Sequence, residues 1–189
     1  MDNDLFWHLY FMLPIIPGGV LSMWARKTNF LNRLSTPLDR GTVLKDGRRL
    51  FGENKTWKGL VFMVLFTAVF TILLNVYPGL HDPVRSLNII VIEGLYGAGL
   101  GFVYILSELP NSFIKRRIDI APGKNARGIK GIVFTIIDQV DSIIGCAIVI
   151  SLCTPTTFSL FCKMVIVASA IHYAINVLLY LARLKSQAG

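Results

Sequence analysis

The sequence is poor in charged residues. They make up only 16% of its 189 residues, against roughly 25% in soluble domains, while hydrophobic residues reach 53%. Cysteine is also scarce, and Cys146, Cys153 and Cys162 show no paired metal-ligand spacing, so we expect small buried apolar side chains rather than disulfides or zinc ligands. An internal repeat is lacking too, which leaves an inverted-repeat transporter without support. This composition is typical of a membrane protein.

The apolar residues are gathered into five stretches that are long enough to cross a hydrocarbon core, which takes roughly 20 helical residues. They cover residues about 5–24, 57–77, 87–106, 132–153 and 158–182. Prolines and glycines interrupt the first stretch between Pro14 and Gly19, which predicts a bent helix. The sequence therefore predicts an all-α integral membrane protein with about five transmembrane helices, forming one domain over residues 1–189.

Basic residues alternate along the chain. Residues 26–58 hold nine Lys and Arg and residues 115–130 hold six, whereas the intervening loops hold Arg85 and Lys163 alone. The positive-inside rule then predicts an amino terminus outside, two basic cytoplasmic loops and a cytoplasmic carboxy terminus. We expect a multi-pass protein of the cell (inner) membrane.

The fourth stretch carries two carboxylates, Asp138 and Asp141, which share one face of a helix because they are three residues apart. Ionised carboxylates at this depth need a partner, water or a cation. Three interpretations stay open at this point. They are a structural polar cluster with a Lys or Arg, a proton or ion pathway that includes Glu93, and a site for Mg²⁺ or Mn²⁺, which prefer hard oxygen ligands.

The two basic segments suggest which ligand such a cation would help to bind. Residues 37–59 combine glycines with Arg and Lys, a composition suited to polyphosphate, and residues 108–124 are expected to form a second loop facing the same carboxylates. Thr56 precedes an apolar helix whose positive end would attract an anion, although it is equally a plain helix cap. The alternative is that these charges only set topology and contact anionic headgroups.

Several motifs together resemble the CDP-archaeol synthase family, which is related to the CTP:phosphatidate cytidylyltransferases. They are Asp46-Gly47-Arg48-Arg49, Phe51-Gly52, Lys55-Thr56-Trp57-Lys58-Gly59, Ser112-Phe113-Ile114-Lys115-Arg116-Arg117, Asp138-Gln139-Val140-Asp141, and His172 with Asn176. The resemblance covers nearly the whole chain. It implies a Mg²⁺-dependent transfer of CMP from CTP to a membrane lipid phosphate, giving a CDP-lipid and pyrophosphate. Nucleic acid is not expected as a partner, and a homodimer is left open.

The resemblance also implies roles for individual residues. The catalytic residues would be Asp138, Asp141, Lys115 and Arg116, and the metal ligands Asp138, Asp141 and Glu108. The substrate-binding residues would be Asp46, Arg48, Arg49, Lys55, Thr56, Lys58, Ser112, Arg117 and Gln139. Mn²⁺ could replace Mg²⁺. Where archaeal family members have a Gly-Asp pair, this chain has Ser107-Glu108, and the segment 123–131 is longer and more basic than in the family.

Other assignments stay open. Ser112 would bind a phosphate oxygen or cap a short helix, Gln139 would contact nucleotide or a neighbouring span, and His172 with Asn176 would form an interhelical hydrogen-bonding pair or contact substrate. A proton- or ion-coupled transporter is the main alternative function. A CDP-alcohol phosphotransferase is disfavoured because its longer Asp-rich spacing is missing. The choice between ether-linked and ester-linked lipid is left open.

Overall fold

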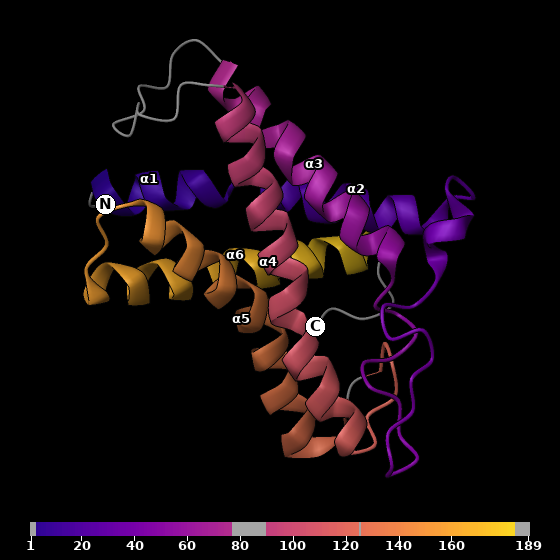
Figure 1. Cartoon of the computed structure of the whole chain (residues 1–189). Helices are drawn as coiled ribbons and strands as arrows, with labels where there is room; N and C mark the ends of the chain where they lie inside the picture. The colour runs from indigo at the N-terminus through magenta and orange to yellow at the C-terminus, as the bar shows by residue number, and fades with distance from the viewer. Residues whose placement is uncertain (1–2, 77–89, 125, 184–189) are drawn as a thin grey trace.

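The computed structural model describes residues 3–76, 90–124 and 126–183, and its regular elements are helical (Figure 1). These elements are α1 (Asn3–Met12), α2 (Ile15–Lys27), the short 3-10 helix η1 (Asn32–Ser35), α3 (Trp57–Val76), α4 (Ile90–Arg117), α5 (Gly128–Cys153) and α6 (Phe158–Leu181). Extended pairing in the described part is limited to two isolated bridges in the loop between η1 and α3 and at its borders. The predicted all-helical class is confirmed.

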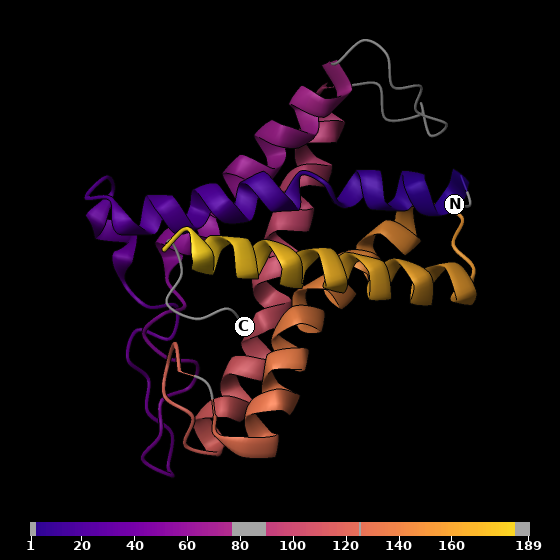
Figure 2. The ribbon, with the colours of Figure 1, turned by 180° about the vertical axis from the view of Figure 1, so that it is seen from behind.

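Four segments are long and apolar enough to cross a membrane: Asn3–Lys27, Trp57–Leu74, Gly128–Cys153 and Phe158–Leu181. The first contains α1 and α2, which are separated at Leu13 and Pro14 because proline has no N–H for the helical ladder. Figure 2 shows α2 continuing roughly along the line of α1, so the interruption produces little bend. The predicted count of five spans stays a prediction, since α4 is not among the four and part of the expected stretch 87–106 lies outside the described residues.

The long helix α4 corrects the expected loop boundary. We expected a loop from residue 107, but the helix continues through Pro110 to Arg117. The polar residues of this segment recur at helical spacing, so that Glu108, Asn111 and Lys115 lie along one side. Basic residues in the last turn also suit the negative end of the helix dipole. The basic motif is therefore presented on a rigid helix.

Glycines allow α4 to lie close to both of its neighbours, between α3 and α5 (Figure 1). A Cβ atom on Gly101 would be 2.7 Å from the carbonyl oxygen of Met63 on α3. A Cβ atom on Gly145 of α5 would be 1.9 Å from the hydroxyl of Ser107 on α4. In Figure 2, α6 lies alongside the α1–α2 segment, which it contacts through α1. This arrangement brings α4, α5 and α6 around a common interior.

The loop between η1 and α3 is organised by one buried carboxylate. Asp39 accepts hydrogen bonds from the backbone N–H groups of Gly41, Phe51 and Gly52 at 3.0–3.2 Å, and from the Arg49 guanidinium at 2.7 Å. Burial alone would raise the pKa of Asp39, but Arg49 and these N–H groups hold it well below its usual range. The carboxylate therefore stays ionised and fixes the loop shape.

Candidate active site

The carboxylate pair predicted on the fourth stretch faces α4. Asp138 and Asp141 both accept hydrogen bonds from the amide Nδ2 of Asn111, at 2.6 and 2.8 Å. Lys115, one turn further along α4, places its Nζ 2.5 Å from Asp138 Oδ1, while the backbone N–H of Ser142 donates to Asp141 at 2.6 Å. The predicted shared helix face is confirmed. The structural polar-cluster interpretation predicts that one carboxylate pairs with a Lys or Arg, and the ion pair between Lys115 and Asp138 agrees with that part of it.

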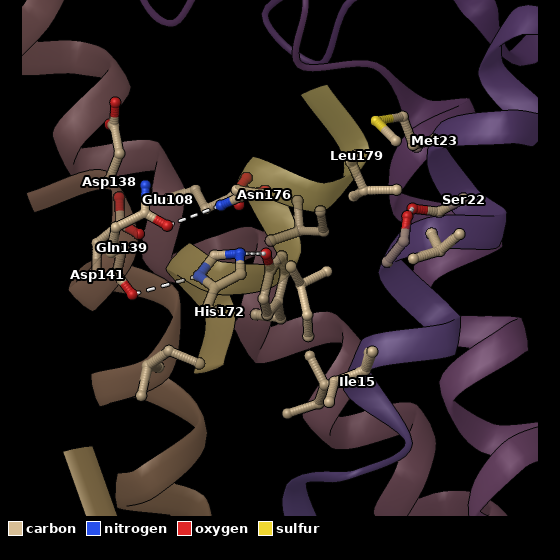
Figure 3. A pocket seen from close by; sticks show the side chains of 18 of the residues that line it. Ile15, Ser22, Met23, Glu108, Asp138, Gln139, Asp141, His172, Asn176 and Leu179 are labelled. Carbon is tan, nitrogen blue, oxygen red and sulfur yellow. Dashed lines mark hydrogen bonds between the residues drawn. The ribbon is translucent and has the colours of Figure 1, made fainter. Parts of the chain in front are cut away.

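A cavity of about 540 Å³ adjoins this pair and has two chemically different ends. The apolar end is lined mainly by α1, α2 and α6, with Phe6, Leu9, Leu13, Ile16, Val20, Ile171, Ile175 and Leu179. The polar end is lined by Arg26, Lys55, Thr56, Glu108, Asn111, Ser112, Lys115, Arg116, Asp138, Gln139, Asp141, His172 and Asn176. Figure 3 shows Glu108, Asp138 and Asp141 on one side of this space and Ser22, Met23 and Leu179 on the other. The cavity can therefore hold an amphiphile.

Glu108 lies at the polar end but is already engaged. Its carboxylate forms an ion pair with Lys55, which belongs to the first loop, and both side chains are largely buried. Glu108 and Lys55, both predicted site residues, are thus brought together at the cavity. The role of Glu108 as a metal ligand stays a prediction.

Arg116 supplies an uncompensated positive charge. It is 9% exposed, it lines the cavity, and its Nε and Nη1 atoms have no hydrogen-bond partner among the described residues. A buried guanidinium without partners is costly, whereas phosphate oxygens would satisfy it with charge-assisted hydrogen bonds. The side chain is therefore suited to an anionic ligand.

The floor of the cavity is an interhelical hydrogen-bond network. Asn176 Nδ2 donates to Gln139 Oε1 at 2.7 Å, and His172 Nδ1 lies 3.3 Å from the carbonyl oxygen of Gln139. Tyr104 Oη lies 3.1 Å from His172 Nε2, and these contacts join α4, α5 and α6 (Figure 3). The predicted interhelical pair of His172 and Asn176 is confirmed, and Gln139 has the predicted bond to a neighbouring span.

Thr56 and Ser112 also line the cavity. The hydroxyl of Thr56 accepts a hydrogen bond from the backbone N–H of Gly59 at 3.1 Å, so its interpretation as a helix cap is confirmed. Ser112 is not at a helix end, because α4 continues to Arg117, so the alternative that it caps a short helix is wrong. Substrate contacts by both residues stay predictions.

Five predicted substrate-binding residues do not line the cavity: Asp46, Arg48, Arg49, Lys58 and Arg117. Lys58 is 1% exposed and donates to the carbonyl oxygen of Thr28 at 2.7 Å, so it joins α2 to the start of α3. Arg49 is paired with Asp39 in the first loop, which raises the pKa of its guanidinium. Both cations therefore have structural partners within the chain, and their predicted substrate contacts stay predictions.

The other three belong to a loop–helix cluster, made up of Asp46, Arg48, Arg117 and Asp119. Arg48 pairs with Asp119 at 2.6 Å, and Arg117 pairs with Asp46. Arg48 also donates to the carbonyl oxygen of Arg117, while Arg117 donates to that of Arg49. The cluster therefore fastens the first loop to the end of α4, beside the cavity.

Comparison with known proteins identifies the family. Residues 1–188 match the family described as CarS-like, CDP-archaeol synthase. The CDP-archaeol synthase of Thermococcus onnurineus is 31% identical over 135 residues, covering 71% of this chain and 72% of that protein. That of Pyrococcus furiosus is 29% identical over 199 residues, covering 97% and 95%. The chain belongs to the CDP-archaeol synthase family.

A solved structure agrees with the fold of this CDP-archaeol synthase family member. It is described as an intramembrane enzyme for archaeal membrane lipids biosynthesis, and it matches with a TM-score of 0.58 and 24% identity, covering 88% of this chain and 90% of that one. Family membership confirms CTP-dependent cytidylyl transfer to a lipid phosphate, and no comparison supports the transporter alternative. Glu93, the further residue of that alternative, does not line the cavity.

The polar wall fits a small divalent cation. Mg²⁺ is usually held by one or two carboxylates, with water and substrate phosphates completing the octahedron. Asp138 and Asp141 provide two such carboxylates, and Asn111 Oδ1 is a buried oxygen beside them without a hydrogen-bond partner. Within the described ranges, no group of three or more His, Cys, Asp or Glu side chains is placed to hold a metal ion.

Two residues of this site escaped the sequence analysis. Asn111 connects the two carboxylates, and Arg26 reaches the cavity from the end of α2. The spacing of Asn111 to Lys115, four residues apart, would have placed both on one helix face if α4 had been expected to continue through Pro110. Nothing in the sequence separates Arg26 from the other basic residues of its segment.

Proposed function

We propose that this chain is a Mg²⁺-dependent CTP:lipid-phosphate cytidylyltransferase whose acceptor is an ether-linked glycerol phosphate of the archaeal type. The observation that supports this most is the cavity with a carboxylate pair and an unpaired Arg116 at one end and an apolar lining at the other. The lipid phosphate and CTP would meet at the polar end, while a lipid chain would follow the apolar end between α2 and α6.

The reaction forms a bond between an oxygen of the lipid phosphate and the α-phosphorus of CTP. The bond from that phosphorus to the β-phosphate oxygen breaks, and pyrophosphate leaves. The phosphomonoester is already anionic at neutral pH, so no strong general base is needed. The difficulty is the repulsion between two anions, which fixed cations offset. Arg116, Lys115 and Arg26 would hold the phosphates in line at the polar end.

Asp138 and Asp141 would hold the Mg²⁺, which supplies Lewis-acid stabilisation of phosphate charge when bound. Lys115 contacts Asp138 in the described structure and lies at the same wall as Arg116. Its ammonium group would then move from the carboxylate to a phosphate oxygen. The Lys55–Glu108 ion pair closes the polar end on the side of the first loop.

The polar end would open to the cytoplasm, where CTP is dissolved. This placement follows from the basic segments 26–58 and 115–130, with the amino terminus outside and the carboxy terminus inside. Accessibility labelling of single cysteines introduced at Arg40 and Ser159 in sealed vesicles would test it. Opposite labelling of these two sites is expected, and labelling of both from the same side would contradict the orientation.

The lipid class is tested by following radiolabelled CMP from CTP into the lipid phase. The purified chain in detergent receives Mg²⁺ and CTP with either a geranylgeranyl-ether glycerol phosphate or a diacylglycerol phosphate. We expect transfer to the ether lipid at a clearly higher kcat/KM. Preference for the diacyl lipid would contradict the proposed acceptor while leaving cytidylyl transfer in place.

A further inference from the structure

Asn111 carries a buried oxygen that the contacts described so far leave unused. The side chain is 6% exposed, and its Nδ2 donates to both Asp138 and Asp141. Its Oδ1 atom is buried without a hydrogen-bond partner among the described residues. Leaving a buried acceptor without a hydrogen bond is unfavourable, and a purely structural role explains the Nδ2 group of this amide but not its Oδ1 atom.

The amide has two orientations that occupy the same space. A half turn about the Cβ–Cγ bond exchanges Nδ2 and Oδ1 without displacing any other atom. In the orientation described, the NH₂ group donates to two carboxylates. In the other, the carbonyl oxygen takes its place, and three oxygens face one another, which is favourable only when a cation lies among them.

We infer that Asn111 is a direct ligand of the divalent cation, through Oδ1, together with Asp138 and Asp141. This inference rests on the proposed function, because it assigns a ligand to that same metal site. The nearest other carboxylate on this side of α4, Glu108, is held by Lys55, whereas Asn111 is already placed between the two aspartates. The amide would serve as donor in the cation-free site and as ligand in the cation-bound site.

The test is Mn²⁺ binding by the full chain in detergent, without CTP or lipid, measured from the electron paramagnetic resonance signal of free Mn²⁺. Asn111→Leu removes the amide and should weaken Mn²⁺ binding at least about tenfold, by the scale of losses at metal sites. Asn111→Asp keeps an oxygen but cannot donate, and should bind Mn²⁺ at least as tightly as the wild type. Asn176→Leu removes another buried amide of the same cavity and should leave Mn²⁺ affinity unchanged.

Asn111→Leu and Asn111→Asp together distinguish a metal ligand from a side chain that only donates hydrogen bonds. If Asn111 only donates hydrogen bonds, removing the amide leaves both carboxylates free for the cation, so Asn111→Leu will bind Mn²⁺ at least as tightly as the wild type, and the inference is overturned. Weaker binding by Asn111→Asp than by the wild type overturns it as well. Should Asn111→Leu fail to give monodisperse, cooperatively unfolding protein, Asn111→Ala, which also removes the amide, takes its place with the same expected results.

Asp138→Asn distinguishes this inference from the proposed function. Wild-type Mn²⁺ binding that Asp138→Asn abolishes and that Asn111 variants do not alter would contradict only the role of Asn111. Wild-type binding that is undetectable, or that Asp138→Asn leaves intact, would contradict the metal site itself.

Discussion

Two groups of charged residues lie close together in this chain, and they satisfy their charges differently. In the first loop and the loop–helix cluster, three aspartates have guanidinium partners: Asp39 has Arg49, Asp46 has Arg117 and Asp119 has Arg48. At the cavity wall, Asp138 is paired with Lys115, but Asp141 has only neutral N–H partners, and two nitrogens of Arg116 have no hydrogen-bond partner among the described residues. The proposed function assigns ligand binding to the cavity wall, whereas the ion pairs of the loop and the cluster connect parts of the structure.

The largest effect is expected from the carboxylates of the cavity wall. Asp141→Asn removes a charge that faces the proposed Mg²⁺, and turnover should fall at least about 10²-fold, as for loss of a transition-state-stabilising group. The folded state should persist, because Asn keeps the shape and an oxygen for the Ser142 N–H. Radiolabelled CMP transfer and thermal unfolding in detergent would be measured together. Turnover at the wild-type rate in folded Asp141→Asn would contradict a catalytic role for Asp141.

Arg116 allows a sharper test, because activity and stability should change in opposite directions. Arg116→Met removes an uncompensated buried charge, and replacing buried charge by a well-packed apolar chain is often neutral or stabilising. We expect kcat/KM for CTP or lipid phosphate to fall by about 10²-fold and Tm to stay equal or rise. A marked loss of Tm would indicate that Arg116 stabilises the fold, and would contradict the distinction between the cavity wall and the ion-paired loop residues.

In the first loop, a substitution should lower stability more than it lowers CMP transfer, which is the reverse of the expectation for the cavity wall. Asp39→Asn breaks the set of hydrogen bonds that fixes the loop and should cost about 1–3 kcal/mol of unfolding free energy. The pKa of Asp39 is lower in the folded protein than in the unfolded chain. The ionised Asp39 carboxylate therefore contributes fully to the free energy of unfolding above its unfolded-state pKa of about 3.9. This contribution is lost as the pH falls through its lower folded-state pKa.

Thermal unfolding of wild type and Asp39→Asn between pH 3 and pH 7 would show this. The gap in Tm between the two should be constant above about pH 5 and narrow as the solution becomes more acidic. A gap that widens in acid would contradict the assignment of Asp39 as an ionised organiser of the loop.

The smallest effect is expected at the exposed edge of the loop–helix cluster. The Asp119 side chain is 72% exposed, and exposed ion pairs contribute about 1 kcal/mol or less. Asp119→Asn should change Tm only slightly, should leave CMP transfer as in the wild type, and serves as the matched control for Asp141→Asn. A large loss of CMP transfer would show that Asp119 or its partner Arg48 also takes part in catalysis.

Some of this architecture follows from the sequence because it depends on local spacing. Asp138 and Asp141 share a helix face since they are three residues apart, and His172 with Asn176 face neighbouring helices since they are four apart. Both expectations were confirmed by contacts across α4, α5 and α6. Composition and hydropathy were sufficient for the helical membrane class.

The partners of the basic residues could not be predicted in the same way. Lys58 belongs to the same family motif as Lys55, and Arg49 belongs to another motif of the first loop, yet of these three only Lys55 reaches the cavity. Their partners, Thr28 and Asp39, are set by how the first loop folds back on α2 and α3, which spacing does not encode. The third stretch was expected to end at residue 106, whereas α4 accommodates Pro110 and continues to Arg117.

The central claim is that Asp138, Asp141 and Arg116 at the α4–α5 wall perform cytidylyl transfer. Its most direct test is pyrophosphate release from CTP and Mg²⁺ by the purified chain, with and without an ether-linked glycerol phosphate, in wild type, Asp138→Asn and Asp119→Asn. We predict release that requires the lipid, disappears in Asp138→Asn and persists in Asp119→Asn. Release that persists in folded Asp138→Asn, or is lost equally in both variants, would contradict the account.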